Sequence, residues 1–335
     1  SAATEILFAT PGIALNWFTA NGLNGFTTVV LDEFHERRWD TDLLLALLQD
    51  RAEHRLVLTS ATFAGSKLAD FVNGPHLEAP GQAHHVEVTY LGAEPRTMPT
   101  GRDLAKRTAS AVRSCLGATR GDVLVFLPGR GEIQADADVL TLHGSAPPQE
   151  QKRALQPGDR QRVILATNVA ETSLTVPGVT AVVDSGLERR TQQRNGRTVL
   201  ALQPIAQANA DQRKGRAGRT EPGLCMRLWG SQAPLPKVAP PETQREDLTD
   251  LVLAAAVAGR PARQLTFPDP PRPASLERAE ATLNDLGAID TSGRATRRGE
   301  ELFGLPVDTA FAALMLAMPA EATAGFMADL AAALQ

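Results

Sequence analysis

The chain has 335 residues, 43% of them hydrophobic, and a formal net charge of −4 at pH 7. This length allows two or three domains. Because no uninterrupted apolar run reaches about 18 residues, we expect no transmembrane span and no membrane partner. The two cysteines, Cys115 and Cys225, argue against a disulfide framework and favour a cytoplasmic protein.

Short apolar runs alternate with segments of helical spacing through the first two thirds of the chain. The expected strands are residues 28–31, 55–58, 86–91, 122–127, 162–166 and 180–183. The expected helices include 40–49 and 105–115. The βαβ alternation occurs twice, so we expect the α/β class with tandem doubly wound parallel sheets. GAEPRTMPTG at 92–101 has two prolines and two glycines and is interpreted as the linker between two lobes.

After residue 229 the composition changes to a proline-rich stretch and then to helical patterns. Residues 247–258 and 275–290 are predicted to be helical, with FPDPP at 267–271 breaking the chain between them and Gly287 ending the second helix. A turn and a further helix are expected in 291–302, and the alanine-rich segment 311–334 is also predicted to be helical.

An apolar strand runs directly into acids and a histidine in VVLDEFHER at 29–37. A carboxylate at the end of a buried strand can hold Mg²⁺ through its water shell, and a second one can deprotonate the attacking water. We therefore assign Asp32 and Glu33 to the metal, with Glu33 as the general base. On its own, an acidic pair after a strand is more often an exposed turn.

A second string, QRKGRAGR at 212–219, packs four cations around two glycines. Catalysis of phosphoryl transfer depends on positioning and on cations that meet the charge developing on the γ-phosphate. Arg216 and Arg219 suit the role of arginine fingers. Together the two strings predict an ATPase site supplied by two lobes, with ATP and Mg²⁺ as cofactors.

With these strings, the chain resembles the DEAH/RHA group of superfamily 2 helicases, and within it the bacterial HrpB type, whose box is likewise DEFH. The family's motifs occur in order: FATPGIAL at 8–15 (Ib), DEFH at 32–35 (II), SAT at 60–62 (III), LVFLPGRGEI at 124–133 (IV), LHGS at 142–145 (IVa), ATNVAETSLTVPG at 166–178 (V) and QRKGRAGR (VI). The resemblance implies RecA-like lobes and an ATP-dependent RNA helicase that moves 3′ to 5′.

The resemblance also implies a domain order. Residues 1–92 correspond to the C-terminal part of RecA-like lobe 1, 93–101 to a linker, 102–231 to lobe 2, 232–308 to a degenerate winged helix and 309–335 to the start of a helical ratchet domain.

Further site residues follow from the resemblance alone. His35 would couple the nucleotide site to Gln212, which would position the lytic water; a histidine at a strand end is about as often a structural hydrogen-bonding residue. Ser60 and Thr62 would link the ATP state to lobe geometry, although SAT is also a common loop string, and Thr172 would join the nucleotide-binding set. The expected contacts with the sugar-phosphate backbone are Thr10, Gly129, Gly144, Ser145, Thr167 and Asn168.

Between Glu188 and Arg219 the sequence has eight cations and two acids, and phosphate contacts need only such a local excess. Asn195-Gly196 at the centre of this region is a strong hairpin signal. We expect Arg194 and Arg197 on this hairpin to contact single-stranded RNA or an RNA duplex with an overhang, with DNA not excluded. The alternative is that these charges are solvated.

Two departures from the family pattern bear on function. The sequence contains no GxxxxGK[ST], the loop that cradles phosphates. Since the chain opens at motif Ib, we expect a truncation, with the first strands of lobe 1 upstream of Ser1. The competing hypothesis is an ATPase-inactive nucleic-acid-binding or scaffold protein of the same fold. Pro177 also stands where the family usually has an acid, which leaves nucleotide selectivity open.

Overall fold

The computed structural model describes residues 5–61, 65–79, 81, 84–129, 139–171, 174–194, 197–317, 325 and 329. The chain divides into two compact units. The first unit consists of Ser1–His76, Gln193–Thr198 and Pro240–Gln335, and the second of Leu77–Gln192 and Val199–Ala239.

The first unit combines a short parallel sheet with helices from distant parts of the chain. Strand β1 (Thr28–Leu31) pairs in parallel with β2 (Arg55–Leu58), with the bounds that the sequence predicts. The other elements of this unit are α1 (Pro11–Asn21), η1 (Phe34–Glu36), α2 (Trp39–Arg51), α3 (Gly65–Val72), α7 (Glu242–Arg245), α8 (Thr249–Val257), η5 (Ala262–Gln264), α9 (Pro273–Asp285), α10 (Arg297–Phe303) and α11 (Thr309–Ala317).

Helix α2 lies at the centre of the first unit. Its residues 43–48 form an uninterrupted apolar run and are at most 1% exposed, as expected for an enclosed helical segment. It packs against α1 and against α8, whose residues 251–256 are also buried. One hydrophobic core therefore joins two segments that the sequence analysis assigned to separate domains, 1–92 and 232–308.

The second unit is built on a six-stranded parallel sheet with the order β3-β10-β7-β4-β6-β5. Its strands are β3 (Val86–Tyr90), β4 (Asp122–Phe126), β5 (Val139–Leu142), β6 (Val163–Ala166), β7 (Val179–Asp184) and β10 (Gly223–Arg227). Its helices are α4 (Leu104–Ala118), α5 (Pro148–Leu155), η3 (Asn168–Ala170), α6 (Gln207–Gly215) and η4 (Arg216–Gly218).

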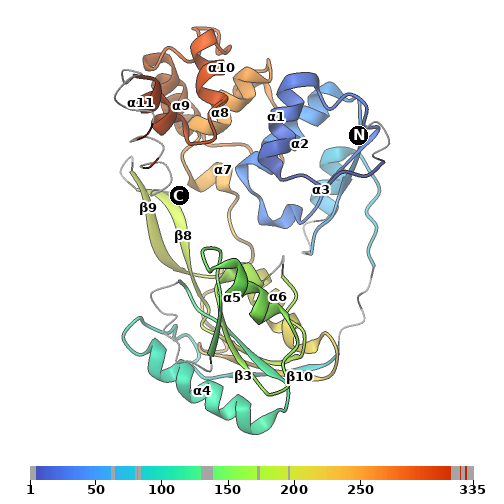
Figure 1. Ribbon diagram of the computed structural model, residues 1–335, viewed down its shortest axis with the longest axis vertical. Coiled ribbons are helices and arrows are strands. Elements are labelled where there is room, and N and C mark those ends of the chain that lie inside the picture. Colours follow the sequence, from blue (N-terminus) through green and yellow to red (C-terminus); the bar gives the residue numbers. More distant parts are fainter. Residues whose placement is uncertain are drawn as a thin grey trace. The chain divides into compact units, whose positions relative to one another are not determined.

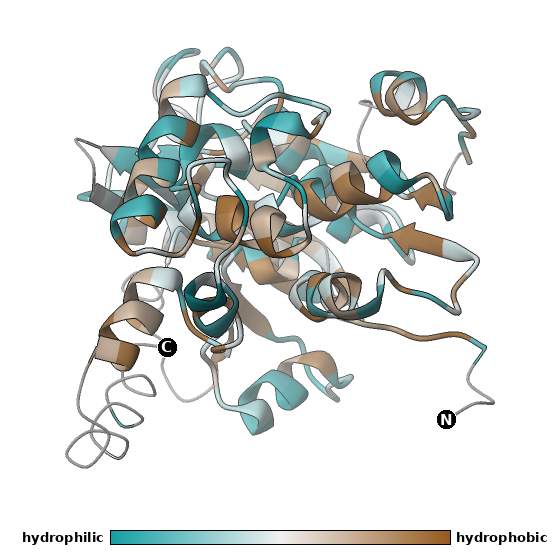
Figure 2. Cartoon of the chain, turned by 90° about the horizontal axis from the view of Figure 1, so that it is seen from above, coloured by the Kyte–Doolittle hydropathy of each residue, from teal (hydrophilic) through white to brown (hydrophobic). Residues whose placement is uncertain are grey.

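Alternation along β4 explains why helices cover both faces of this sheet. Val123 and Val125 pack with Cys115 of α4, whereas Leu124 and Phe126 belong to the core that contains α5. Figure 1 shows α4 on one face and α5 and α6 on the other. In Figure 2 several strands are mainly brown while helices carry both teal and brown residues, the pattern of an enclosed sheet covered by amphipathic helices.

Strand β3 corrects one assignment made from the sequence. Residues 86–91 fall inside the range 1–92 given to the first lobe, but β3 pairs with β10 in the sheet of the second unit. The segment 92–101, interpreted as the linker, is also bound there, because Gly92 donates its N–H to the Trp229 carbonyl at 3.0 Å. The units divide near His76 and Leu77 instead. A short apolar run does not specify its partner strand, so sequence order alone misplaced β3.

Strands β8 (Leu187–Arg194) and β9 (Arg197–Pro204) pair with each other as a separate two-stranded sheet. This agrees with the predicted hairpin. Its turn, Asn195-Gly196, lies outside the described residues, as do the side chains of Arg194 and Arg197.

Capping contacts define the ends of the C-terminal helices of the first unit. Gly287 has φ +66°, which suits the glycine predicted to end this helix, and the Thr296 hydroxyl accepts the Gly299 N–H at 3.2 Å. The Asp308 carboxylate accepts the N–H of Phe311 at 2.8 Å and so caps α11, and Asp250 of α8 accepts the N–H of Thr309 at 2.9 Å. Across the described part of the chain, every helix is too short or too polar to cross a bilayer.

The shared core gives a stability prediction. Leu253 of α8 is 2% exposed, so Leu253→Ala is expected to lower the free energy of unfolding of the first unit by about 2–5 kcal/mol. Because α2 and α8 share that core, amide hydrogen exchange should accelerate in both helices, as measured by mass spectrometry beside urea denaturation.

The matched control is Leu124→Ala, which removes a residue that is 1% exposed in the core of the second unit. It should accelerate exchange in β4 and leave α2 unchanged. Unchanged exchange in α2 of the Leu253→Ala protein would contradict a shared core.

Candidate functional site

Asp32 lies directly after β1, at the end of the strand that the sequence predicts. Its Oδ1 accepts the N–H of Glu33 at 3.0 Å and the Thr59 hydroxyl, and that hydroxyl oxygen also accepts the Glu33 N–H at 3.2 Å. Thr59 follows β2, the parallel neighbour of β1. The sequence analysis did not select Thr59; the predicted adjacency of the two strand ends is the signal that could have found it.

The donor set at Asp32 fits a magnesium ion. The side chain is exposed, and both hydrogen bonds reach Oδ1, so Oδ2 has no donor among the described residues. Mg²⁺ is commonly held by one or two carboxylates together with waters and substrate phosphates. Within the described ranges no group of three or more His, Cys, Asp or Glu side chains could form an all-protein site, and this mode of binding requires none.

Glu33 and His35 stand together in the same loop. Glu33 has φ +51°, the left-handed region, and its Oε2 lies 3.3 Å from His35 Nδ1. That nitrogen also accepts the Ala61 N–H at 3.2 Å. Nδ1 can accept a hydrogen bond only when it carries no proton, whereas an ion pair with Glu33 requires a proton on Nδ1. The two contacts therefore exclude each other. His35 Nε2 is buried and has no hydrogen-bond partner in the described structure.

Other predicted residues of the first unit have clear positions. Ser60 is exposed and follows Thr59 after β2, whereas Thr62 lies outside the described residues. Thr10 is the N-cap of α1, where its hydroxyl accepts the Ile13 N–H at 3.5 Å.

In the second unit, the predicted backbone-contacting residues gather at one edge of the sheet. Gly129 follows β4, Gly144 and Ser145 follow β5, and Thr167 and Asn168 follow β6. The strand order β4-β6-β5 is parallel, so these three loops leave neighbouring carboxyl ends. Gly144, Ser145 and Asn168 are exposed, Thr167 is half-buried and Gly129 is buried.

Gln212 lies on α6. Its Nε2 and Oε1 are both buried and have no hydrogen-bond partner among the described residues. Leaving both ends of an amide unsatisfied is costly, so such a group is a candidate for binding a ligand.

The two proposed arginine fingers differ in their surroundings. Arg216 is 7% exposed, and its guanidinium donates to the carbonyl oxygens of Glu171 and of Leu174, the latter at 2.9 Å. Arg219 is exposed and donates to the Thr175 hydroxyl. Thr172 lies outside the described residues.

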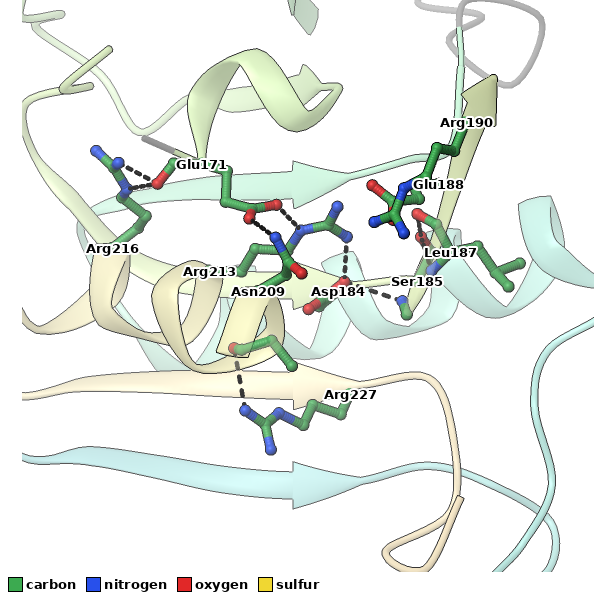
Figure 3. Close-up of polar contacts among 12 residues, drawn as sticks. Glu171, Asp184, Ser185, Leu187, Glu188, Arg190, Asn209, Arg213, Arg216 and Arg227 are labelled. Carbon is green, nitrogen blue, oxygen red and sulfur yellow. Dashed lines mark hydrogen bonds and ion pairs between the residues drawn. The ribbon is translucent and has the colours of Figure 1, made fainter. Parts of the chain in front are cut away.

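A buried ionic network joins α6 to Glu171 and Asp184 (Figure 3). Arg213 is 1% exposed and donates to Glu171 Oε2 at 2.8 Å and to Asp184 Oδ1 at 3.0 Å, with its guanidinium 4.9 Å from the centre of the Phe126 ring. Asn209 donates to the other Glu171 oxygen. Burial raises the pKa of Asp184, an effect that the charge of Arg213 opposes. The network was not predicted, because the pairing of these residues is visible only in three dimensions.

This network corrects the charge count made from the sequence. Arg213 was one of eight cations interpreted as a local excess available to phosphates, but it is enclosed between two carboxylates. Arg190 forms an ion pair with Glu188, and both side chains are largely buried. The count along the chain therefore overstates the positive charge on the surface of the second unit.

Comparison with known proteins adds to this geometry. Residues 108–221 match the family model described as the helicase conserved C-terminal domain. The chain is 34% identical to the ATP-dependent RNA helicase HrpA of Escherichia coli, with 87% of this chain aligned, and 36% identical to the human probable ATP-dependent RNA helicase DHX34, with 94% aligned. The crystal structure of the Escherichia coli DEAH/RHA helicase HrpB superposes on 96% of the chain with a TM-score of 0.84 and 33% identity.

The chain corresponds to only part of each of these relatives. It spans 24% of HrpA, 30% of DHX34 and 44% of the HrpB crystal chain.

The buried network leads to a prediction about stability and pH. Arg213→Leu leaves Glu171 and Asp184 buried without their cation, so the free energy of unfolding should fall by about 3–5 kcal/mol. The pKa of Asp184, already raised by burial, should rise further. A carboxyl group whose pKa is higher in the folded than in the unfolded state stabilises the native protein at pH values below its unfolded-state pKa, about 3.9. That stabilisation is lost as the pH rises through the folded-state pKa. Denaturation at about pH 5 and about pH 8 should therefore show a larger deficit at about pH 8.

The control is Arg263→Leu, which removes an exposed ion pair with Glu280. It should cost less than about 1 kcal/mol at both pH values. Equal, small losses for the two variants would contradict a structural role for Arg213.

Proposed function

The chain belongs to the DEAH/RHA helicase family, and from that membership we propose that it acts as an ATP-dependent helicase, hydrolysing ATP with Mg²⁺ while moving 3′ to 5′ along RNA. The observation that carries the proposal is the placement of Asp32 and Glu33 immediately after a strand, with Thr59 from the neighbouring strand holding them. Carboxyl ends of parallel strands are where α/β proteins bind nucleotides.

Each residue of the first unit has a proposed chemical role. Asp32 would hold Mg²⁺ through its exposed carboxylate, and Glu33 would take the proton from the attacking water. Mg²⁺, when bound, supplies positive charge to the phosphate oxygens. His35 would change its hydrogen-bond partner during this step, because its Nδ1 cannot accept the Ala61 N–H and form an ion pair with Glu33 at the same time.

The second unit offers three further groups with proposed roles in ATP hydrolysis. The unsatisfied amide of Gln212 suits the orientation of a water molecule. Arg219 is exposed and held by one hydroxyl, so it can turn to a phosphate at little cost. Arg216 would have to exchange the carbonyl oxygens of Glu171 and Leu174 for phosphate oxygens, a change that would make its contribution specific to the nucleotide-bound state.

Recognition of RNA is proposed for the loops at the carboxyl ends of β4, β5 and β6, together with Thr10 and the β8–β9 hairpin. Exposed glycine, hydroxyl and amide groups suit contacts with the sugar-phosphate backbone, which carry no sequence information. RNA is chosen over DNA because the related HrpA and DHX34 are named RNA helicases. A cytoplasmic location belongs to the same proposal, since both cysteines are free thiols.

A second candidate function rests on the printed sequence. It contains no GxxxxGK[ST], the motif of a phosphate-binding loop. Without such a loop, these 335 residues would bind nucleic acid or act as a scaffold, and they would not turn over ATP. A measurement of ATP hydrolysis decides between the two functions. It uses the longest natural chain that contains these residues, hereafter the natural chain.

The first test replaces the proposed base. In the natural chain, Glu33→Gln should keep ATP and Mg²⁺ affinity while RNA-stimulated turnover falls roughly 10²- to 10⁴-fold, the usual contribution of a general base. Steady-state phosphate release and equilibrium ATP binding measure the two properties separately.

Glu36→Gln is the matched control, because Glu36 is an exposed carboxylate in the same loop, and its turnover should stay near that of the parent. Near-normal turnover in Glu33→Gln would remove Glu33 from the role of base. A parent without turnover would favour the scaffold function.

A second test concerns the β8–β9 hairpin. Replacing Arg194 and Arg197 with Gln, with Gly196 kept, should reduce duplex unwinding more than ATP hydrolysis. It should also lower the slope of log affinity against log salt by about 0.7 per lost phosphate contact on single-stranded RNA. RNA affinity at several salt concentrations and a strand-displacement assay measure these effects.

The control removes two positive charges outside the hairpin, with Gln at Arg113 and Arg120, which are both exposed. Its slope and unwinding should match those of the parent. The same result for the hairpin variant would return Arg194 and Arg197 to solvated surface charges.

A further inference from the structure

Asp269 of the FPDPP segment pairs with two cations of the first unit, one from the loop before α2 and one from helix α3. Arg37 Nη1 donates to its Oδ2 at 2.6 Å, and Lys67 Nζ donates to its Oδ1. Arg37 is the last residue of the VVLDEFHER string, and Lys67 lies on α3, shortly after the SAT string. Although burial raises the pKa of Asp269, the hydrogen bonds from Lys67 and Arg37 lower it to a net value below the ordinary range, so the carboxylate is charged at neutral pH.

The segment that presents Asp269 is stiff. Asp269 lies between Pro268 and Pro270, whose rings fix their own φ angles, and Phe267 and Pro268 are buried. The backbone that carries this carboxylate is therefore restricted.

Arg37 is held from several sides at once. Its Nε and Nη2 form a two-pronged contact with Asp42 at 3.0 and 2.9 Å, and Asp42 is fully buried in the first turn of α2. The guanidinium lies 5.5 Å from the centre of the Phe34 ring. The Arg37 carbonyl also accepts the Glu242 N–H at 3.0 Å. A two-pronged arginine contact fixes direction as well as distance.

The loop between β1 and α2 needs such support. Glu33 at φ +51° and Arg37 at φ +49° both adopt the left-handed conformation without being glycine, which persists only where the surroundings enforce it. Thr59 holds the start of the loop, through Asp32 and through its carbonyl, which accepts the Phe34 N–H at 2.9 Å. Arg37 holds the end.

We propose that Asp269 is a positioning residue for the acidic loop: by anchoring Arg37 and Lys67 it fixes the geometry of Asp32 and Glu33 and ties the segments after motifs II and III to the C-terminal helices of the first unit. The catalytic consequence rests on the proposed ATPase function. The positioning itself does not, and it can be measured without ATP.

The test variant is Asp269→Asn, which keeps the shape of the side chain and removes its charge. The control is Asp50→Asn. Asp50 also joins the N-terminal and C-terminal parts of the first unit, through two 2.6 Å contacts with Arg260, and it is 22% exposed against 24% for Asp269. Both variants therefore neutralise an ion-paired carboxylate of similar exposure, but only Asp269 contacts the acidic loop.

Hydrogen exchange on the 335-residue chain is the first measurement. Asp269→Asn should accelerate exchange of the amides of Phe34, Glu36 and Arg37 by about tenfold or more, while Asp50→Asn should leave them unchanged and Asp269→Glu should partly restore protection. Equal exchange of these amides in both Asn variants would overturn the proposal.

Turnover by the natural chain is the second measurement. Asp269→Asn should lower kcat by about tenfold or more with a change in KM of less than about threefold, because displaced groups lose rate before they lose affinity. Asp50→Asn should retain the parent kcat. Faster exchange with an unchanged kcat would limit Asp269 to a structural role and overturn the catalytic half of the proposal. A parent without turnover would instead contradict the proposed function, and the exchange result alone would then judge the positioning.

Discussion

Parallel pairing of strands is the constraint on which both groups of candidate residues depend. It brings the carboxyl ends of neighbouring strands to one edge of a sheet. In the first unit this sets Asp32 after β1 beside Thr59 after β2, and in the second it gathers the loops that follow β4, β5 and β6. The functional groups can lie far apart in the sequence, because the sheet brings them close together in space.

Two arginines, Arg37 and the buried Arg213, secure what the sheets bring together, and they do so in the same way. Arg37 lies between Asp42 and Asp269 and against Phe34, and Arg213 lies between Glu171 and Asp184 and against Phe126. A planar guanidinium can satisfy two carboxylates and still face an aromatic ring, which an ammonium group cannot do as well. Each arginine belongs to one of the two proposed nucleotide-binding strings, so structural charges and proposed catalytic charges are neighbours in both units.

The sequence predicted secondary structure correctly where the residues that determine it are neighbours in the chain. The bounds 28–31 and 55–58 match β1 and β2, because each apolar run is flanked by polar residues. The ordered motifs also identified the family. Features that depend on tertiary pairing were missed: the membership of β3 in the second sheet, the single core shared by α2 and α8, and the burial of Arg213. The assigned roles of Glu33, Gln212 and Arg219 stay predictions.

Arginines of the second unit are proposed to stabilise the charge that develops during ATP hydrolysis. This proposal carries the whole mechanism. It is tested most directly by comparing two ligands, a non-hydrolysable ATP analogue and Mg-ADP-aluminium fluoride, in the parent natural chain and in Arg219→Ala. Arg219 is exposed and makes one side-chain contact with Thr175, so its removal should leave the fold intact. The account predicts analogue affinity within about threefold of the parent and aluminium fluoride affinity at least about tenfold weaker, because only the second ligand mimics the transition state. Equal affinity losses for both ligands, or none for either, would contradict it.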